Sequence, residues 1–277
     1  MDMLRCADGV RLHLRRWPTA LPARGTVQIV HGLGEHIERY AALAARLNAQ
    51  GWHVAGHDQR GHGRSEGPRG SVPSRQALLC DLAVVTDHLR SRGRHVLLGH
   101  SLGGLIAARF VAESLGVRAA RWVRDVDALV LSSPALALGL GRRQRLLLAL
   151  LARATPALRL GNGLQPDWIS RDAAVVHAYR TDPLVHDRIT PRLLRFMVES
   201  GHLVAERAAA WRTPTLLLWA GADRCVLPAG SAAFAGAAPP AVVQAQYFDG
   251  LAHEIFNEPE PDREQVLAVL THWLARF

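Results

Sequence analysis

Lysine is absent from this sequence of 277 residues, so all 33 of its positively charged side chains are arginines. Against 24 acidic residues they leave a formal net charge of +9. The arginines are spread over the whole chain, few aromatic residues lie among them, and no nucleic-acid-binding motif is present, which argues against a nucleic-acid partner. We interpret the charge as a solvated surface, or as one that favours anionic lipid surfaces or acidic substrates.

Cysteine is scarce, and long apolar runs are missing altogether. Cys6, Cys80 and Cys225 are odd in number, lie far apart and include no Cys-x-x-Cys pair, which argues against a disulfide framework and a zinc ribbon. No apolar stretch reaches the length of a membrane span, and the N-terminus lacks the basic and apolar regions of a signal peptide. These absences predict a soluble, cytoplasmic protein with reduced thiols.

Short runs rich in valine, leucine and isoleucine alternate with helix-like segments along most of the chain. Runs that are apolar on both faces are typical of a parallel sheet covered by helices. We expect strands at 26–32, 53–58, 95–100, 128–133, 214–220 and 242–248. Asp8-Gly9 separates two further strand-like runs and predicts a hairpin that gives the sheet an antiparallel edge. The pattern predicts an α/β fold.

One interval breaks this alternation. Residues 135–213 form a segment of about 80 residues, which is far more than the crossover that a pair of parallel strands needs. We predict a helical cap over residues 135–213, inserted into a core domain made of residues 1–134 and 214–277. The cap would lie over the sheet edge at which open α/β proteins bind their ligands.

The most informative motif is Gly-x-Ser-x-Gly at residues 99–103. It directly follows an apolar strand and directly precedes a helical segment, which is the setting of a nucleophilic serine on a sharp turn. A serine hydroxyl needs a base and a group that orients the base. Asp223 and His253 follow the last two predicted strands, so they should reach the same sheet edge as Ser101. We predict Ser101 as nucleophile, His253 as general base and then acid, and Asp223 as the orienting carboxylate.

The predicted chemistry also needs hydrogen-bond donors for the oxyanion. The strand at 26–32 runs into the glycine-rich turn HGLGEH, where the backbone can approach a ligand closely. We expect the backbone amides of Leu33 and Leu102 to face the ester oxygen from two sides.

Seven motifs in order now extend from residue 31 to residue 259: HGLGEHIERY, HDQRGHGRSEGPRG, GHSLGG, SSPAL, TDPL, GADRCV and AHEIFNEP. Together they resemble the monoacylglycerol lipase and lysophospholipase-like branch of the α/β hydrolases. The resemblance implies a mostly parallel eight-stranded sheet flanked by helices, with a helical cap inserted after strand 6. It also implies a serine hydrolase that needs no cofactor and cleaves single-chain acyl esters, above all monoacylglycerols.

Several other functions remain open at this point. Proteins described as serine aminopeptidases and carboxylesterases share these motifs, so a lysophospholipase, a general carboxylesterase and an aminopeptidase-type amide hydrolase are alternatives. A ligand receptor on the same fold is an alternative from another class. The complete set of Ser101, Asp223 and His253 argues against the receptor, because binding alone needs no activated hydroxyl.

The resemblance further suggests a contact for the polar head of the substrate. By analogy, Glu35 and Arg39 would contact the head of a glycerol ester, and the alternative is a surface ion pair between residues four apart. Phe256 stands where some members of the branch carry a second histidine near the head group, so head-group recognition is expected to differ here.

Other polar residues near the predicted site have simpler interpretations. His57, Asp58 and His62 would be a metal site only if they converged, but adjacent strand residues point to opposite faces and no His-Glu-x-x-His pattern exists, so we expect no metal. His100 is expected to support the turn. Cys225 is interpreted as a buried filler, with sensitivity of the site to thiol reagents as the alternative.

The apolar run LLLALL, residues 146–151, permits two interpretations within the cap. One is a helix buried on the core domain. The other is a helix that lines an acyl tunnel and makes peripheral contact with a lipid surface, with Arg142, Arg143 and Arg145 at the headgroups.

Overall fold

The computed structural model describes residues 2–90, 93–116 and 120–277. Its centre is an eight-stranded sheet in the order β1-β2-β4-β3-β5-β6-β9-β10, parallel from β4 to β10. The strands are β1 (Asp2–Arg5), β2 (Arg11–Trp17), β3 (Gly25–Val30), β4 (Trp52–His57), β5 (Arg94–His100), β6 (Ala128–Ser132), β9 (Thr215–Ala220) and β10 (Val243–Phe248). The predicted fold class is confirmed.

The antiparallel edge of the sheet is the hairpin expected at Asp8-Gly9. β1 pairs with β2 so that Arg5 faces Arg11, and β2 continues antiparallel along β4. Gly9 has a φ of +90°, a conformation that favours glycine. The turn chemistry read from the sequence therefore accounts for this edge.

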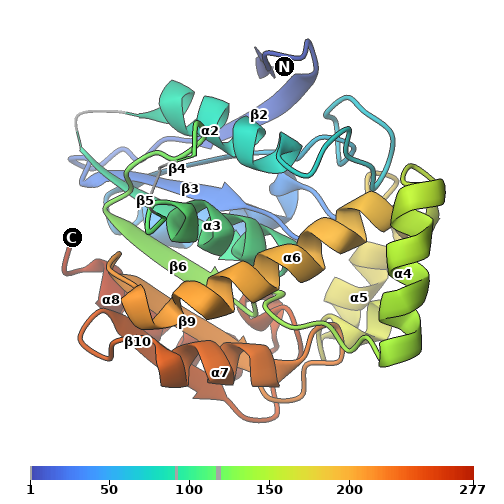
Figure 1. The fold of residues 1–277 in the computed structure, drawn as a ribbon. Helices are drawn as coiled ribbons and strands as arrows, with labels where there is room; N and C mark the ends of the chain where they lie inside the picture. Colours follow the sequence, from blue (N-terminus) through green and yellow to red (C-terminus); the bar gives the residue numbers. More distant parts are fainter. Residues whose placement is uncertain (1, 91–92, 117–119) are drawn as a thin grey trace.

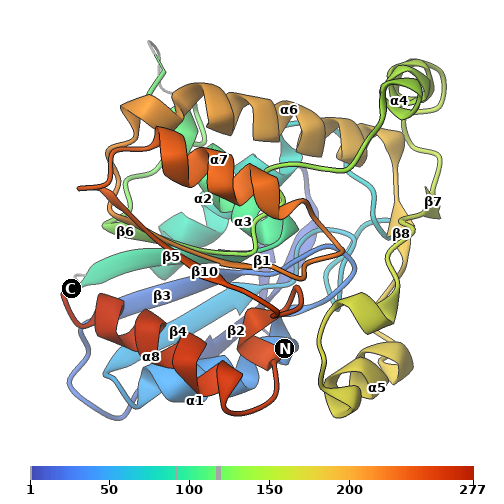
Figure 2. The same cartoon turned by 90° about the horizontal axis from the view of Figure 1, so that it is seen from below.

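Helices cover both faces of the sheet (Figure 2). One face carries α1 (Ala41–Asn48) and α8 (Asp262–Leu274), and the other carries α2 (Ala77–Leu89), α3 (Leu102–Glu113), α6 (Pro191–Arg207) and α7 (Pro228–Ala237). On β5, Val96 and Leu98 pack into the first layer, whereas Leu97 between them packs into the second. Each such leucine contributes about 1.5–3 kcal/mol of burial free energy, which is why the strand is apolar on both faces.

Residues 142–189 of the segment between β6 and β9 lie beyond the carboxyl ends of the strands, whereas α6 runs along the face of the sheet against α3 (Figure 1). The segment contains α4 (Arg142–Ala154), β7 (Leu160–Gly161), α5 (Ala173–Thr181), β8 (Arg188–Ile189) and α6. β7 and β8 form a separate two-stranded sheet. Among the described residues, none of the helices combines the length and the apolar character that crossing a membrane requires.

Helix α6 joins this segment to the core. Phe196, Met197 and Val204 of α6 share one hydrophobic cluster with α3. The division into a core of residues 1–134 and 214–277 and a cap of residues 135–213 stays a prediction, with α6 as the element that both parts would use.

Candidate active site

Ser101 occupies the turn between β5 and α3 in a strained backbone conformation. Its φ is +53°, which for a residue other than glycine costs about 1–3 kcal/mol. Three backbone hydrogen bonds of 3.0 Å hold it there: Ser101 N–H donates to Ser132 O, and Ser101 O accepts from Leu105 N–H and Ala135 N–H. The surrounding structure thus fixes the residue at the carboxyl end of the sheet.

The flanking glycines are required by close packing of backbone against backbone. A Cβ atom at Gly103 would lie 1.9 Å from Val30 O, and one at Gly99 would lie 2.5 Å from Gly103 O. On the other side, a Cβ atom at Gly32 would lie 3.2 Å from the Ser101 Cβ. The HGLGEH turn after β3 therefore lies directly against the serine.

The two predicted oxyanion donors flank Ser101. Leu102 is the first residue of α3, so its N–H group has no acceptor within the helix. Leu33 follows Gly32 in the turn and lines the same cavity as Ser101. The role of both amides in catalysis stays a prediction, and their placement beside the serine is what that role requires.

Three hydrogen bonds that no sequence pattern indicated hold the HGLGEH turn in place. His31 Nε2 accepts from Gln59 N–H at 2.8 Å, which leaves its Nδ1 to donate to Gly32 O at 2.8 Å. Burial lowers the pKa of His31, in agreement with this neutral tautomer. From the segment before β8, His186 N–H donates to Gly34 O at 2.8 Å.

Asp223 and His253 meet in loops after β9 and β10. His253 Nδ1 and Asp223 Oδ2 are 2.6 Å apart, and Asp223 Oδ1 accepts from the backbone amides of Cys225 at 2.8 Å and Val226 at 3.0 Å. Burial lowers the pKa of His253, but the charge and hydrogen bond of Asp223 outweigh burial and raise it above its ordinary value. The carboxylate thus binds Nδ1–H and leaves Nε2 as the free nitrogen.

His253 stands beside the serine turn without bonding to the serine. Its ring centroid is 4.7 Å from that of His100, the residue before Ser101. Among the described residues, no hydrogen bond joins Ser101 to His253, an arrangement common before substrate binds. His100 bonds through Nδ1 to Ser132 Oγ at 3.1 Å, and burial lowers its pKa to about 4, so this histidine is a neutral support for the turn.

Glu35 and Arg39 form the expected ion pair, but the pair is buried rather than on the surface. Arg39 Nη1 lies 2.8 Å from Glu35 Oε2, and the two side chains are 11% and 5% exposed. Arg39 also binds both carboxylate oxygens of Glu254, at 2.6 and 2.8 Å. The alternative of a surface pair is therefore wrong, and the predicted contact with a substrate head group stays a prediction.

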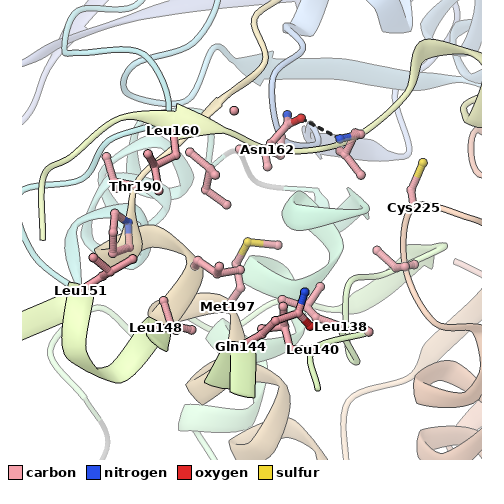
Figure 3. A pocket seen from close by; sticks show the side chains of 18 of the residues that line it. Leu138, Leu140, Gln144, Leu148, Leu151, Leu160, Asn162, Thr190, Met197 and Cys225 are labelled. Carbon is pink, nitrogen blue, oxygen red and sulfur yellow. Dashed lines mark hydrogen bonds between the residues drawn. The ribbon is translucent and has the colours of Figure 1, made fainter. Parts of the chain in front are cut away.

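A cavity of about 370 Å³ opens from Ser101 into the segment between β6 and β9 (Figure 3). In Figure 3, Leu148 and Leu151 of α4, Leu160 of β7 and Met197 of α6 project toward one another, with Cys225 on the opposite side. Besides Ser101, the wall carries the polar side chains of Asn162, Gln144 and Thr190. The lining is otherwise apolar, which suits a hydrocarbon chain.

The run LLLALL belongs to α4, and its buried-helix interpretation is wrong. Leu148 is its buried leucine, whereas Leu146 is 65% exposed and Leu150 is 58% exposed. Leu147 is exposed and also lines the cavity. One helix therefore contributes to the cavity wall and presents leucines to the outside.

Ligand-type side chains converge at one place in the described part of the chain. Asp223, Cys225 and His253 have their nitrogen, oxygen and sulfur atoms within 4.8 Å of one another. Burial, followed by the Asp223 charge, raises the pKa of the Cys225 thiol, so the sulfur is protonated. Asp58, a candidate metal ligand in the sequence, lies with its Oδ2 3.2 Å from His13 Nδ1.

Comparison with known proteins places the chain among serine hydrolases. Residues 22–260 match the family model "Serine aminopeptidase, S33". The chain is 33% identical over 274 residues to a monoacylglycerol lipase of Mycolicibacterium smegmatis, covering 96% of this chain and 93% of that protein. It is 30% identical to an uncharacterized abhydrolase domain-containing protein of Dictyostelium discoideum, covering 98% of this chain and 28% of the length of that protein.

A solved structure shows the same similarity. The crystal structure of the Paleococcus ferrophilus monoacylglycerol lipase is 35% identical and matches with a TM-score of 0.84. The match covers 96% of this chain and 98% of that chain.

Proposed function

The chain belongs to the serine aminopeptidase S33 family of the α/β-hydrolase superfamily, and from this premise we propose that it is a monoacylglycerol lipase. It is a serine hydrolase that acts on carboxylic ester bonds. The expected substrate is a single-chain acyl ester of glycerol, and the products are a fatty acid and glycerol.

The observation that carries the choice of substrate is the cavity that begins at Ser101. Leucine is the most frequent residue in its wall, and the cavity leads from the serine toward α4. A single acyl chain in this cavity would place its ester carbon at the serine hydroxyl. We propose that residues 135–213 act as the cap that shields this chain from water.

The site residues would catalyse acylation as follows. His253 Nε2 takes the proton of Ser101 Oγ while Oγ attacks the ester carbon. The N–H groups of Leu33 and Leu102 stabilise the oxyanion that forms. When the tetrahedral intermediate collapses, the ester C–O bond breaks and His253 donates its proton to the departing glycerol oxygen.

Deacylation uses the same groups with water in place of serine. His253 takes a proton from water, the hydroxide attacks the acyl-Ser101 ester, and the proton returns to Ser101 Oγ as the fatty acid leaves. Asp223 stabilises the imidazolium in both half-reactions. No step requires a cofactor.

The test is hydrolysis of monoacylglycerols and p-nitrophenyl esters with short, medium and long acyl chains. We expect wild type to prefer medium or long chains, Ser101→Ala to be inactive, and the remote control Ser114→Ala to match wild type. Aminoacyl anilides test the aminopeptidase alternative. A wild-type protein that is inactive on every ester would refute the proposal.

We also propose that α4 contacts lipid surfaces. Leu146 and Leu150 are exposed on this helix, and residues 135–166 contain five arginines and no acidic residue: Arg142, Arg143, Arg145, Arg153 and Arg159. Exposed leucines beside arginines favour the interface of an anionic bilayer.

Sedimentation with anionic vesicles tests this lipid contact. The double variant Leu146→Ser/Leu150→Ser should lose vesicle binding, whereas Leu21→Ser, which changes a leucine that is 50% exposed far from α4, should retain it. Equal binding by all three proteins would contradict the contact. The expected cytoplasmic location stays part of the proposal, and cell fractionation tests it.

A further inference from the structure

We propose that Arg39 is a positioning residue that fastens the oxyanion turn, through Glu35, to the loop that carries His253, through Glu254. This inference rests on the proposed function, because it concerns the geometry of the same ester-cleaving site. It assigns Arg39 a role different from contact with the substrate head group.

Glu35 stabilises the HGLGEH turn through hydrogen bonds within the turn and to the residues that follow it. Its Oε1 accepts from Gly32 N–H at 2.5 Å and from Tyr40 O–H at 2.7 Å, and its Oε2 accepts from Arg39. Gly32 is the residue that packs against Ser101 and precedes the predicted donor Leu33. The carboxylate of Glu35 therefore holds the His31–Gly32 peptide, which directly precedes the peptide that carries the Leu33 N–H group.

Arg39 connects this carboxylate to the general-base loop. Its Nη1 bonds to both Glu35 and Glu254, and its Nη2 bonds to the second oxygen of Glu254. Glu254 directly follows His253, and its carboxylate also accepts from Asn257 Nδ2 at 2.8 Å. Bidentate contacts between arginine and carboxylate restrict orientation as well as distance.

The same guanidinium reaches the cap. It stacks on the ring of Tyr179 of α5, with 4.9 Å between the guanidinium carbon and the ring centroid. Glu254 N–H donates to Ile169 O at 2.7 Å, which is a second bond between the His253 loop and the segment between β6 and β9. Arg39 thus contacts three parts of the protein: the HGLGEH turn through Glu35, the His253 loop through Glu254, and α5 through Tyr179.

The contacts of Glu35 and Arg39 leave little capacity for a ligand. Both oxygens of Glu35 and both terminal nitrogens of Arg39 already have protein partners. Neither residue lines the cavity that contains Ser101. A buried guanidinium between two buried carboxylates is a structural support whose loss would leave the carboxylates unpaired.

The charges of Glu35, Arg39 and Glu254, which together form the Arg39 cluster, also affect the pKa of His253. One cation and two carboxylates leave a net negative charge near His253, whose ring is faced by Asp223, Glu254, Glu35, His100 and Cys225. Glu254 and Glu35 add to the effect of Asp223 in raising the pKa of His253. Neutralising either glutamate should therefore lower the pKa of His253.

The experiment compares Arg39→Met, Glu254→Gln and Glu35→Gln with a matched control, Arg60→Met. Arg60 is likewise a buried arginine that binds two carboxylates, those of Asp81 and Asp8, away from the cavity. We would measure kcat and KM on a monoacylglycerol and on p-nitrophenyl butyrate, whose leaving group has no glycerol hydroxyls. The thermal midpoint of each variant shows which effects are only loss of stability.

We expect Arg39→Met to lower kcat about 10- to 100-fold on both substrates, with KM little changed. The two glutamine variants, which keep size and an acceptor oxygen, should move the acid limb of kcat/KM to lower pH. Arg60→Met should lose thermal stability but keep the wild-type kcat and the wild-type acid limb of kcat/KM. If Arg39→Met does not fold, Glu254→Gln provides a second test of the positioning role.

Three results would overturn the inference. A loss confined to monoacylglycerol, expressed in KM, would make Arg39 a head-group ligand. If Arg39→Met keeps the wild-type kcat on both substrates, the cluster has only a structural role. The same conclusion follows if neither glutamine variant shifts the acid limb of kcat/KM. If wild type cleaves no ester, the rate at which a fluorophosphonate labels Ser101 replaces turnover, and the inference then requires Arg39→Met to slow that labelling about tenfold while Arg60→Met does not.

Discussion

Replacing Asp223 by asparagine should leave the fold intact and abolish most of the activity. Asp223 Oδ1 accepts from two backbone amides, those of Cys225 and Val226. In Asp223→Asn the amide oxygen must stay at that position to accept both bonds, so the NH₂ group faces His253 Nδ1. An NH₂ group donates, and His253 Nδ1 would have to accept.

The consequence is the wrong tautomer of the base. With Nδ1 as acceptor, the proton of the neutral imidazole moves to Nε2, which then has no lone pair to take the proton of Ser101. The expected loss in kcat is about 10⁴-fold, as in triads whose aspartate is replaced in this way. In transition-state terms this is about 5 kcal/mol.

The pH profile gives an independent check on the reasoning. Asp223 raises the pKa of His253 above 6.5, whereas burial lowers it. Without the carboxylate, burial dominates, so the residual activity of Asp223→Asn should keep its acid limb at lower pH than wild type. The slow variant would therefore be active at acid pH values where wild type has lost its base to protonation.

The assay is kcat/KM on p-nitrophenyl butyrate across the acid range, with Asp182→Asn as the matched control. Asp182 also pairs with a histidine, 2.7 Å from His36 Nε2, and also accepts a backbone amide, that of Leu184. The control should retain wild-type kcat. A kcat of Asp223→Asn within tenfold of wild type would refute the tautomer argument, and an acid limb at higher pH would refute the charge argument.

Three further predictions follow from the packing around the site. Gly103→Ala should lose about 3 kcal/mol of unfolding free energy in urea because its Cβ would meet Val30 O, whereas Gly236→Ala, with no atom within 4 Å, should lose nothing. Leu148→Phe should narrow the cavity and reduce kcat/KM for long-chain esters about tenfold without affecting acetate esters, and Leu158→Phe, outside the cavity, is its control. Maleimide at neutral pH should leave wild type and Cys225→Ser equally active, because burial raises the pKa of the Cys225 thiol and keeps its sulfur protonated; inactivation of wild type but not of Cys225→Ser would contradict this.

The sheet and the convergence of the three site residues were predictable because each depends on local pattern. Apolar strands and the residues that directly follow them indicate which side chains reach one sheet edge. Ser101, Asp223 and His253 each follow such a strand, and parallel strands bring their ends together. The order of the strands was not needed to place the three residues near one another.

The buried Arg39 cluster was not predictable in the same way. Its spacing of four to Glu35 indicated an ion pair, but the pairing with Glu254 joins positions 215 residues apart. No periodicity signals such a contact, and the one available hint was a charged residue directly after the predicted base. The exposure of α4 depended likewise on which neighbours the rest of the segment provides, which the apolar composition of LLLALL does not reveal.

The bond from His186 N–H to Gly34 O has a consequence for how the enzyme can open. A Cβ atom at Gly34 would lie 2.3 Å from His186 O, so the two backbones interlock without a side chain between them. If the segment before β8 moves outward to admit a lipid, it must either release Gly34 or pull the oxyanion turn with it. Outward movement of this segment would then also displace the backbone beside Ser101, so the position that admits a lipid would differ from the position that cleaves it.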